Sequence, residues 1–460
     1  MSSKAVFRYI VSSKCLSMRL CLFISLLLVM SCSTPHSRPN IVLIVIDTLR
    51  QDHLGCYGYH RNTSPNIDSL AASGVTFRNV QAQSSWTLPS MASMMTGLTH
   101  RVHGTGFWDG AFFGLDPSLA TLPTIMAGNG YQTAAFFNVV FLSPEFGFHR
   151  GFQFYSCESS VEEGLVRNAE DTVNDINRWL NTNSGGGYDP DKPLFLVIHF
   201  YDPHLKYSPP APYDTLFTNP DYTGTYNADW GGKAATAPVN CGNEVPDSTD
   251  IANLEALYDG EIAFVDRNIG RLVAVLGERG LTSNTWFIIT ADHGEEFYEH
   301  CGVGHGHTLY QELLSIPLII TGPGLDPDTE AEAVAAQIDV LPTVLSICGL
   351  SVPEWAEGQD LLSSGRNLRS RDVFSSLVTS FGPWVAVRRG NMKLHWQQSD
   401  DASMQFNLDN DPLETSMLDE VDSSLVESAL WYWATPPAGH PEPADMDQAM
   451  TNALRGLGYL

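Results

Sequence analysis

Residues 40–47 read Asn40-Ile-Val-Leu-Ile-Val-Ile46-Asp47, a run of branched apolar residues that ends on an acid. A continuous apolar run is typical of a strand buried on both faces of a parallel sheet. The pattern recurs where residues 194–200 run into Tyr201-Asp202-Pro203-His204, and where residues 285–291 run into Asp292-His293. Ligands of open α/β sheets gather beyond the carboxyl ends of the strands. The three runs therefore predict an α/β fold with a convergent polar site.

The rest of the chain predicts what surrounds this sheet. Apolar residues at helical spacing indicate helices over residues 161–180 and 251–276. Residues 206–250 are rich in Pro, Gly, Asn and Asp and indicate a long surface excursion. The composition changes near residues 349–358, and strands are expected over 384–388 and 392–396. We therefore predict a catalytic domain over residues 39–350 and a smaller α+β subdomain over residues 351–460.

The N-terminus has the pattern of a targeting segment. Basic residues precede an apolar run over residues 20–30, which is shorter than the roughly 20 residues that cross a bilayer. Leu28-Val29-Met30-Ser31-Cys32 resembles a bacterial lipobox, with Met30 as an unusual occupant. We predict a lipoprotein-type signal peptide over residues 1–31, lipidation at Cys32 and a tether over residues 32–38. A plain cleaved signal peptide is the alternative, and Met18 is a second possible start.

Those segments predict an exported protein, periplasmic or facing the outer membrane, that meets the membrane through its lipid anchor only. The formal net charge of −27 argues against a nucleic-acid partner, because phosphate backbones are bound through an excess of Lys and Arg. An enzyme of anionic esters with this charge must create a local positive field at its site.

The cysteines after Cys32 are odd in number and lack close C-x-x-C spacing, so they predict neither a zinc framework nor a dense disulfide scaffold. One or two bridges remain open in an oxidising compartment, with no pairing readable from the sequence. These residues are Cys56, Cys157, Cys241, Cys301 and Cys348.

Short motifs follow one another in a specific order along nearly the whole mature chain. They are Pro39-Asn40-Ile-Val, Asp47-Thr48-Leu49-Arg50, Ser64-Pro65-Asn66-Ile67-Asp68, Pro89-Ser90, Thr96-Gly97, Pro203-His204, Tyr258-Asp259-Gly260-Glu261, Asp292-His293-Gly294-Glu295, Pro342-Thr343 and Asn407-Leu408-Asp409-Asn410-Asp411-Pro412. In this order they resemble the sulfatase family of the alkaline-phosphatase superfamily. The resemblance implies an alkaline-phosphatase-like central sheet, mixed or mostly parallel and flanked by helices. It also implies a metal-dependent hydrolase of sulfate- or phosphate-type esters.

The chain departs from that family at the nucleophile. Sulfatases carry Cys or Ser at the head of a C/S-x-P-S-R motif and convert it to formylglycine, whereas this chain has Thr87-Leu88-Pro89-Ser90-Met91. Threonine cannot give the aldehyde, so no formylglycine is expected and Thr87 itself is the predicted covalent nucleophile. The aldehyde hydrate's second hydroxyl expels sulfate by elimination, which a sulfated threonine cannot do. Thr87 therefore favours phosphodiester or phosphonate-type monoanions, with an arylsulfatase-like sulfuric ester hydrolase or a phospho-transferase as alternatives.

The resemblance also implies a metal site made of Asp47, Thr87, Asp292 and His293. Formylglycine sulfatases have an Asp-Asp pair and an Asp-Asn pair, an all-oxygen set that suits calcium. Here the pairs are Asp47-Thr48 and Asp292-His293. Replacing a carboxylate and gaining an imidazole favours zinc, manganese or iron, with calcium still possible.

Further residues complete the predicted site. His204 matches the family histidine near the leaving-group oxygen, and His305 stands where family members often carry a lysine. Both are predicted to be catalytic. Asp202, Arg50 and His307 are predicted to bind substrate, with a second metal as the alternative for Asp202.

A third hypothesis comes from another functional class. A degenerate, lipid-anchored relative would bind glycans or phospholipid headgroups without turnover. The retained nucleophile and metal residues argue against it, because a degenerate site is expected to lose at least one of them. The predicted substrate is a small-molecule, glycan or lipid-headgroup ester, and neither its identity nor the oligomeric state is readable from the sequence.

Overall fold

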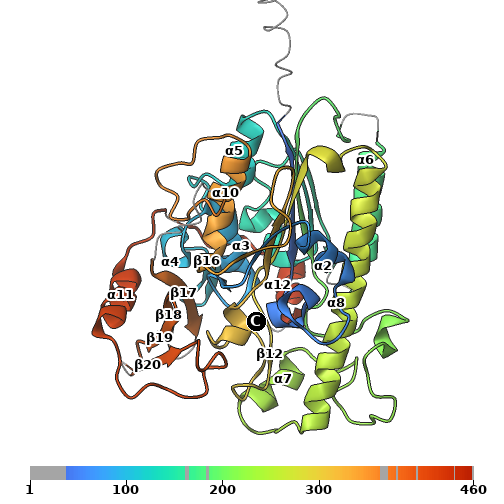
Figure 1. Cartoon of the computed structure of the whole chain (residues 1–460). Coiled ribbons are helices and arrows are strands. Elements are labelled where there is room, and N and C mark those ends of the chain that lie inside the picture. Colours follow the sequence, from blue (N-terminus) through green and yellow to red (C-terminus); the bar gives the residue numbers. More distant parts are fainter. Residues whose placement is uncertain are drawn as a thin grey trace, which may run out of the picture. The chain divides into compact units, whose positions relative to one another are not determined.

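A computed structural model describes residues 38–160, 165–182, 186–362, 371–379, 382–399, 402–439 and 441–457. The predicted signal peptide, Cys32 and all but the last residue of the predicted tether lie outside these ranges. Residues from Pro39 onward cluster as one compact unit (Figure 1). Within the described ranges, no helix is both long enough and apolar enough to cross a bilayer.

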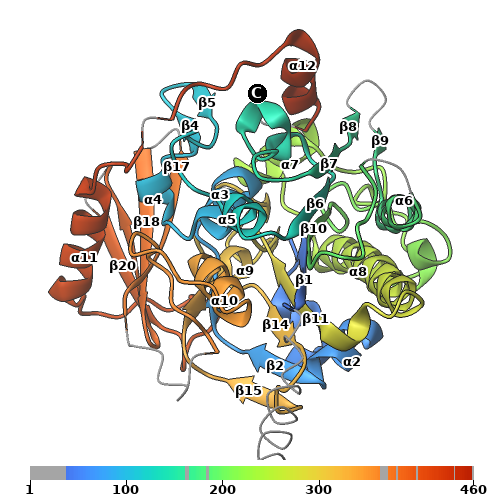
Figure 2. The same ribbon diagram turned by 90° about the horizontal axis from the view of Figure 1, so that it is seen from above.

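The centre of the molecule is an eight-stranded mixed sheet (Figure 2). From one edge to the other its strands are β15 (Thr329–Ala331), β2 (Gly74–Phe77), β14 (Leu318–Thr321), β11 (Thr285–Ala291), β1 (Asn40–Ile46), β10 (Leu194–Phe200), β6 (Gln132–Phe137) and β7 (Phe154–Cys157). The five strands from β11 to β7 are parallel, while β14 is antiparallel to both of its neighbours. This confirms the predicted fold class.

The three apolar runs are the three neighbouring strands in the middle of the sheet. In β1, Ile41 to Ile46 are at most 1% exposed, as expected for a strand covered on both faces. Ile46 pairs with Phe200 of β10 and with Ala291 of β11. Because the three strands are parallel and in this register, their carboxyl ends meet at one edge of the sheet.

Helices cover the two faces of the sheet, α2, α6 and α8 on one and α3, α5 and α10 on the other (Figure 2). The helices are α2 (Pro65–Ala71), α3 (Thr87–Thr96), α4 (His100–His103), α5 (Leu122–Gly128), α6 (Ala169–Leu180), α7 (Lys233–Asn240), α8 (Ser248–Gly277), α9 (Gln311–Leu314), α10 (Val340–Ile347), α11 (Ser423–Ala434) and α12 (Gln448–Leu457). Short 3-10 turns lie at Gln51–His53, Gly55–Tyr57, Val140–Leu142, Pro144–Phe146, Tyr213–Thr215, Thr282–Asn284 and Gln337–Asp339.

The two predicted helices are present with different starts. Helix α8 begins earlier than expected, at Ser248, because Asp247 caps it by accepting hydrogen bonds from Thr249 N and Asp250 N. Helix α6 begins later, at Ala169, where Asn168 provides the cap. Residues 161–164 of the expected helix lie outside the described ranges. The excursion over residues 206–250 contains helix α7, which helical spacing alone did not reveal.

The C-terminal part has its own antiparallel sheet, in the order β17 (Val373–Thr379), β18 (Gly382–Arg389), β19 (Met392–Gln397) and β20 (Ala402–Asn407). Helix α11 packs on it through Leu425, Ala429 and Tyr432, which form a small core with Val385 and Trp396. The small C-terminal subdomain is thus present, while the predicted boundary at residue 350 stays a prediction. Short ladders complete the fold: β3 (Val80–Gln81) with β16 (Ala335–Ala336), β4 (Gly106–Trp108) with β5 (Ala111–Phe113), β8 (Ser159–Ser160) with β9 (Leu165–Val166), and β12 (Glu296–Phe297) with β13 (Val303–Gly304).

The five described cysteines after Cys32 are all free thiols. The sequence left one or two disulfide bridges open, and these five cysteines form none with one another.

Candidate active site

The carboxyl ends of β1 and β11 bring three predicted metal ligands together. One ligand atom each from Asp47, Asp292 and His293 lies within 4.8 Å of the others, and all three residues are fully buried. They are far apart in sequence, and the parallel pairing of β1 with β11 makes them neighbours. Among the described residues this is the single group of three or more His, Cys, Asp or Glu side chains placed to hold a metal ion.

The hydrogen bonds of this group leave three of its four carboxylate oxygens without a partner in the described structure. Asp292 Oδ1 accepts from Thr48 N at 3.2 Å and from His293 N at 2.8 Å, while its Oδ2 has no partner. Neither oxygen of Asp47 has a partner in the described structure. His293 Nδ1 lies 2.9 Å from Gly294 O, the geometry of an N–H donor, which leaves Nε2 as a lone pair facing the two acids.

Electrostatics point to a cation at this position. Burial and the neighbouring Asp292 raise the pKa of Asp47, and burial lowers the pKa of His293 to about 4. A neutral imidazole and two carboxyl groups with three unpartnered oxygens are costly to bury but form a favourable donor set for a divalent ion. The residues present therefore fit the metal that the resemblance implies.

Thr87 lies beside this group. It is the first residue of α3, is 1% exposed, and its Oγ1 is 3.5 Å from His293 Nε2. The N-terminus of a helix carries unpaired amide groups and partial positive charge, which stabilise negative charge on a nearby oxygen. Met91, at the position of the family arginine, is fully buried in the hydrophobic core instead of facing the site.

Two further histidines line the approach to Thr87 and the metal ligands. The His305 ring centroid lies 4.5 Å from that of His293 and 4.7 Å from that of His204. His305 Nδ1 is 2.9 Å from Glu295 Oε1, and His204 Nδ1 is 2.6 Å from Leu205 O. These contacts help to orient both rings.

The protonation states of this group follow from its burial. Burial lowers the pKa of His305 to about 4 and the pKa of His204 to about 3, and it raises the pKa of Glu295 to about 7. The imidazoles are therefore neutral at pH 7, and the Glu295–His305 pair can hold or release one proton there.

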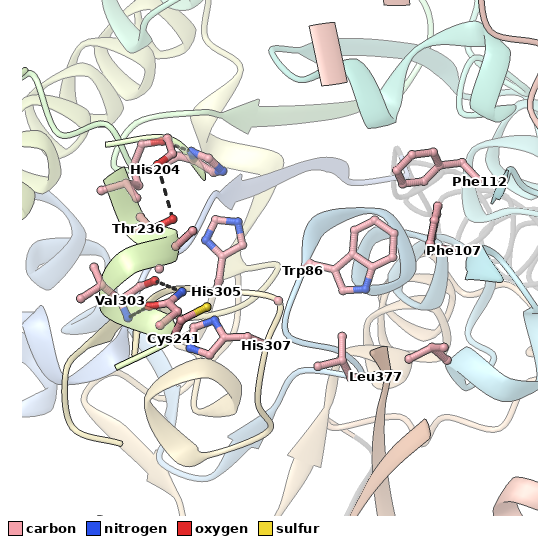
Figure 3. A pocket seen from close by; sticks show the side chains of 17 residues that line it. Trp86, Phe107, Phe112, His204, Thr236, Cys241, Val303, His305, His307 and Leu377 are labelled. Atoms are coloured by element: carbon pink, nitrogen blue, oxygen red, sulfur yellow. Dashed lines mark hydrogen bonds between the residues drawn. The ribbon is translucent and has the colours of Figure 1, made fainter. Parts of the chain in front are cut away.

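A pocket of about 530 Å³ opens in front of these histidines (Figure 3). His204, His305 and His307 lie on one side, and Trp86, Phe107 and Phe112 lie opposite them. The aromatic wall is built by the residue before Thr87 and by the β4–β5 ladder, which are parts of the chain that sequence analysis did not assign to the site. His307 Nε2 is held 2.7 Å from Glu296 Oε2.

Arg50 and Asp202, the other two predicted substrate-binding residues, form contacts with acidic side chains. The Arg50 guanidinium donates to Asp52 Oδ2 at 2.7 Å and to Glu299 Oε1 at 2.5 Å, and it does not line the pocket. Asp202 is paired with the buried Glu261, and burial raises the pKa of Asp202 to about 6. Their substrate-binding roles gain no support from these contacts and stay predictions.

Sequence analysis missed two buried groups at the site, Glu295 and His199. Glu295 belongs to the quoted Asp292-His293-Gly294-Glu295 motif but received no role. His199 lies inside the apolar run of β10 and is fully buried. A histidine in an otherwise apolar buried strand was the signal that could have revealed it, because such a side chain needs a polar partner.

Comparison with known proteins decides the family. The sequence model of the Sulfatase family matches residues 39–350, more than half of the chain. The chain belongs to the sulfatase family. An arylsulfatase of Clostridium perfringens is 26% identical to this sulfatase-family chain over 444 residues, covering 83% of this chain and 90% of the relative. An N-acetylglucosamine-6-O-sulfatase of Bacteroides thetaiotaomicron is 26% identical over 415 residues, covering 72% of each chain.

Solved sulfatase-like structures share the fold. A protein in complex with its substrate D-glucosamine-2-N,6-O-disulfate superimposes with a TM-score of 0.70 at 22% identity, covering 86% of this chain and 97% of that chain. A phosphonate monoester hydrolase of Agrobacterium radiobacter gives a TM-score of 0.68 at 20% identity, covering 86% and 94%. At these identities the likeness establishes the fold alone. Family and fold together confirm the resemblance and identify a sulfatase-family hydrolase.

Proposed function

We propose that this sulfatase-family member is a metal-dependent hydrolase that attacks phosphodiester or phosphonate-type monoanions with Thr87 as covalent nucleophile. The observation that carries the proposal is the position of Thr87 Oγ1, 3.5 Å from a metal-facing His293 Nε2 and at the N-terminus of α3. Such a position supports activation of the hydroxyl and its attack on the substrate.

Asp47, Asp292, His293 and Thr87 would hold the metal. A divalent cation bound there lowers the pKa of the Thr87 hydroxyl and neutralises charge on the transferred group. The mixed carboxylate, imidazole and hydroxyl donor set favours zinc, manganese or iron over calcium.

The proposed reaction has two displacements. In the first, Thr87 Oγ1 bonds to phosphorus, its proton passes to the neutral His305 imidazole, and the bond from phosphorus to the leaving-group oxygen breaks. His305 then returns that proton to the leaving oxygen, with Glu295 holding the ring at 2.9 Å. In the second, water bonds to phosphorus, the bond to Thr87 Oγ1 breaks, and the water's proton restores the hydroxyl. His204 would bind beside the leaving group.

Threonine favours phosphorus over sulfur in this scheme. The second displacement needs water to attack the covalent intermediate, since Thr87 has no second hydroxyl with which to expel the group. Water attack at phosphorus is the more workable of the two steps. A phospho-transferase would use the same intermediate with an alcohol in place of water.

The second candidate is a sulfuric ester hydrolase. It is favoured by the relatives named arylsulfatase and N-acetylglucosamine-6-O-sulfatase, which align over most of the chain. A glycan or small-molecule ester fits both candidates, and the pocket in Figure 3 offers aromatic surfaces that pack against the leaving group of either.

The deciding experiment assays purified protein on an aryl sulfate, an aryl phosphate monoester, a bis-aryl phosphate and an aryl phosphonate, each with zinc, manganese or calcium. We expect the highest kcat/KM on the bis-aryl phosphate or the phosphonate, with zinc or manganese. Preference for the aryl sulfate would establish the second candidate instead. Binding without turnover of any ester would favour the degenerate, headgroup- or glycan-binding alternative.

We also propose that the protein is exported and anchored through a lipid on Cys32, as the lipobox-like residues 28–32 predict. Mass spectrometry of the mature N-terminus and membrane fractionation test this. Cys32→Ser is expected to release the protein from the membrane fraction. An unlipidated N-terminus in the wild type would refute the anchor.

A further inference from the structure

His199 is a buried imidazole that the proposed reaction does not use. It lies in β10, is 0% exposed, and neither of its ring nitrogens has a hydrogen-bond partner in the described structure. Its neighbours in the strand, Ile198 and Phe200, are fully buried apolar residues. An unpartnered buried polar group destabilises the folded state, because it has lost its hydrogen bonds to water without gaining others. An apolar side chain would suit this position better unless a ligand interacts with the ring.

The sheet register places His199 on the same face of the sheet as Asp47 and Asp292, one step before them along the strands. His199 pairs with Val45 of β1, which pairs in turn with Thr290 of β11. Paired residues share a face of the sheet, and residues two apart along a strand share it too. Asp47 N continues the ladder by donating to Phe200 O, so Asp47 lies one row beyond Val45 on the face of His199. Asp292 follows Thr290 of β11 by two residues, so it lies on the same face as His199 too.

The distances point to a shared ligand rather than to direct hydrogen bonds. His199 Nε2 lies 3.7 Å from Asp47 Oδ2 and 3.8 Å from Asp292 Oδ2. An N–H···O bond spans about 2.7–3.2 Å, so these contacts are too long. Two atoms bound to one zinc ion at about 2.0–2.2 Å in tetrahedral geometry are roughly 3.3–3.6 Å apart. The predicted donor group of Asp47, Asp292 and His293 has a similar spacing, since His293 Nε2 is 3.6 Å from Asp47 Oδ1 and 3.5 Å from Asp292 Oδ2.

His199 also faces atoms that need a cation. Asp47 Oδ1 and Oδ2 and Asp292 Oδ2 are unpartnered oxygens of the two predicted metal-binding carboxylates, and the two histidines contact all three between them. Thr290 of β11 lies in the same row of the sheet as His199. Its hydroxyl is not available to the carboxylate oxygens, because Oγ1 donates to Pro317 O at 2.8 Å.

We propose that His199 is a further ligand of the metal centre through Nε2, so that two imidazoles and two carboxylates hold the ion together with the Thr87 hydroxyl. The inference rests on the proposed metal-dependent function. A second imidazole moves the preference of the site further from calcium and toward zinc or another transition metal.

The test counts imidazole ligands directly. Protein loaded with Cu²⁺ as a paramagnetic probe is examined by pulsed EPR, which detects the remote nitrogen of each coordinated imidazole. We expect two imidazoles in the wild type and one in His199→Gln, with His293→Gln as the matched variant that also keeps one. An unchanged count in His199→Gln would overturn the proposal and leave His199 as a positioning residue at most.

Zinc affinity and stability give a second readout that does not depend on activity. Competition with a chromogenic chelator should show at least a tenfold weaker Zn²⁺ affinity in His199→Leu. Without metal this variant should unfold at the wild-type temperature or higher, because it lacks the unpartnered imidazole, and with Zn²⁺ the order should reverse. A variant equally destabilised with and without Zn²⁺ would show a packing role and contradict the proposal.

Failure of this inference is distinguishable from failure of the proposed function. If the wild-type protein has two imidazole ligands but hydrolyses none of the four esters, His199 is a metal ligand and the proposed hydrolase activity is rejected. If the wild-type protein hydrolyses them but has only one imidazole ligand, the hydrolase activity is supported and the proposal that His199 binds the metal is rejected.

Discussion

The molecule contains two fully buried groups of charged side chains that differ in one respect. At the end of β1, both oxygens of Asp47 lack a partner. Beside the C-terminal sheet, Glu414 accepts from Lys393 Nζ at 2.9 Å and from His395 Nε2 at 2.8 Å, both in β19. Lys393 also donates to Leu309 O at 2.8 Å, which ties β19 to the segment that follows His307.

The difference shows that burial alone does not mark a functional site. Lys393 and Glu414 satisfy one another inside the protein, and His395 and Lys393 hold the pKa of Glu414 down at about 2 against the effect of burial. Asp47 and Asp292 have ligand atoms within 4.8 Å of each other, and the side chains described in ion-pair contact with them are His199 and His293, so a bound cation would balance their charge. Unpartnered acids predict a ligand, whereas paired ones predict a structural role.

The largest effect should come from the nucleophile. Thr87→Ala is expected to lower kcat on the preferred ester by at least about 10³-fold, because the variant lacks the hydroxyl proposed to form the covalent intermediate. Thr96→Ala, which removes a buried hydroxyl of the same helix bonded to Ala92 O, is the control and should retain activity. Near-normal turnover in Thr87→Ala would exclude Thr87 as the nucleophile.

Breaking the paired group should affect stability instead of chemistry. Lys393→Met leaves Glu414 buried without its main cation and is expected to lower the free energy of unfolding by about 3–5 kcal/mol, measured by urea denaturation. Adding Glu414→Gln should recover part of that loss, since both charges are then gone. A loss below 1 kcal/mol in the single variant would show that the pair is not the structural element inferred here.

Metal removal should sharpen the contrast. Saturating Zn²⁺ at about 100 to 1,000 times its Kd is expected to stabilise the wild type by about 3–4 kcal/mol over chelated protein. Lys393→Met should show the same increment, because its charges lie outside the metal site. Thermal unfolding with and without chelator measures this, and an unfolding temperature indifferent to metal would refute the cation site.

The smallest effect concerns pH. Burial raises the folded-state pKa of Asp202 to about 6, so the folded protein binds more protons than the unfolded chain between about pH 4 and 6. Stability from this group is present below pH 4 and is lost as pH rises to 6, by about 1–2 kcal/mol. Asp202→Asn should flatten this decline in metal-free protein. Asp191→Asn, at an exposed position, should leave it unchanged.

Several parts of the site were predictable because they stand at strand ends. Asp47, Asp292 and His293 follow apolar runs directly, and parallel strands deliver such residues to one edge whatever loops intervene. Other features depend on contacts that the spacing of residues in the sequence does not predict. Arg50 is two residues from Asp52 and far from Glu299 in sequence, yet it pairs with both. The aromatic wall of the pocket comes from Trp86 and from the β4–β5 ladder, and only the fold brings these two parts of the chain together.

The sequence by itself determined the family, the α/β class, the small C-terminal subdomain and the residues proposed for the metal, since each depends on local pattern or ordered motifs. Only the tertiary structure decided which buried polar atoms have partners. Hydrogen-bond satisfaction depends on atoms hundreds of residues apart meeting within about 3 Å. That is why Glu414 proved to be paired and structural, why Asp47 proved to be unpartnered, and why His199, hidden in an apolar strand, emerged beside the metal ligands.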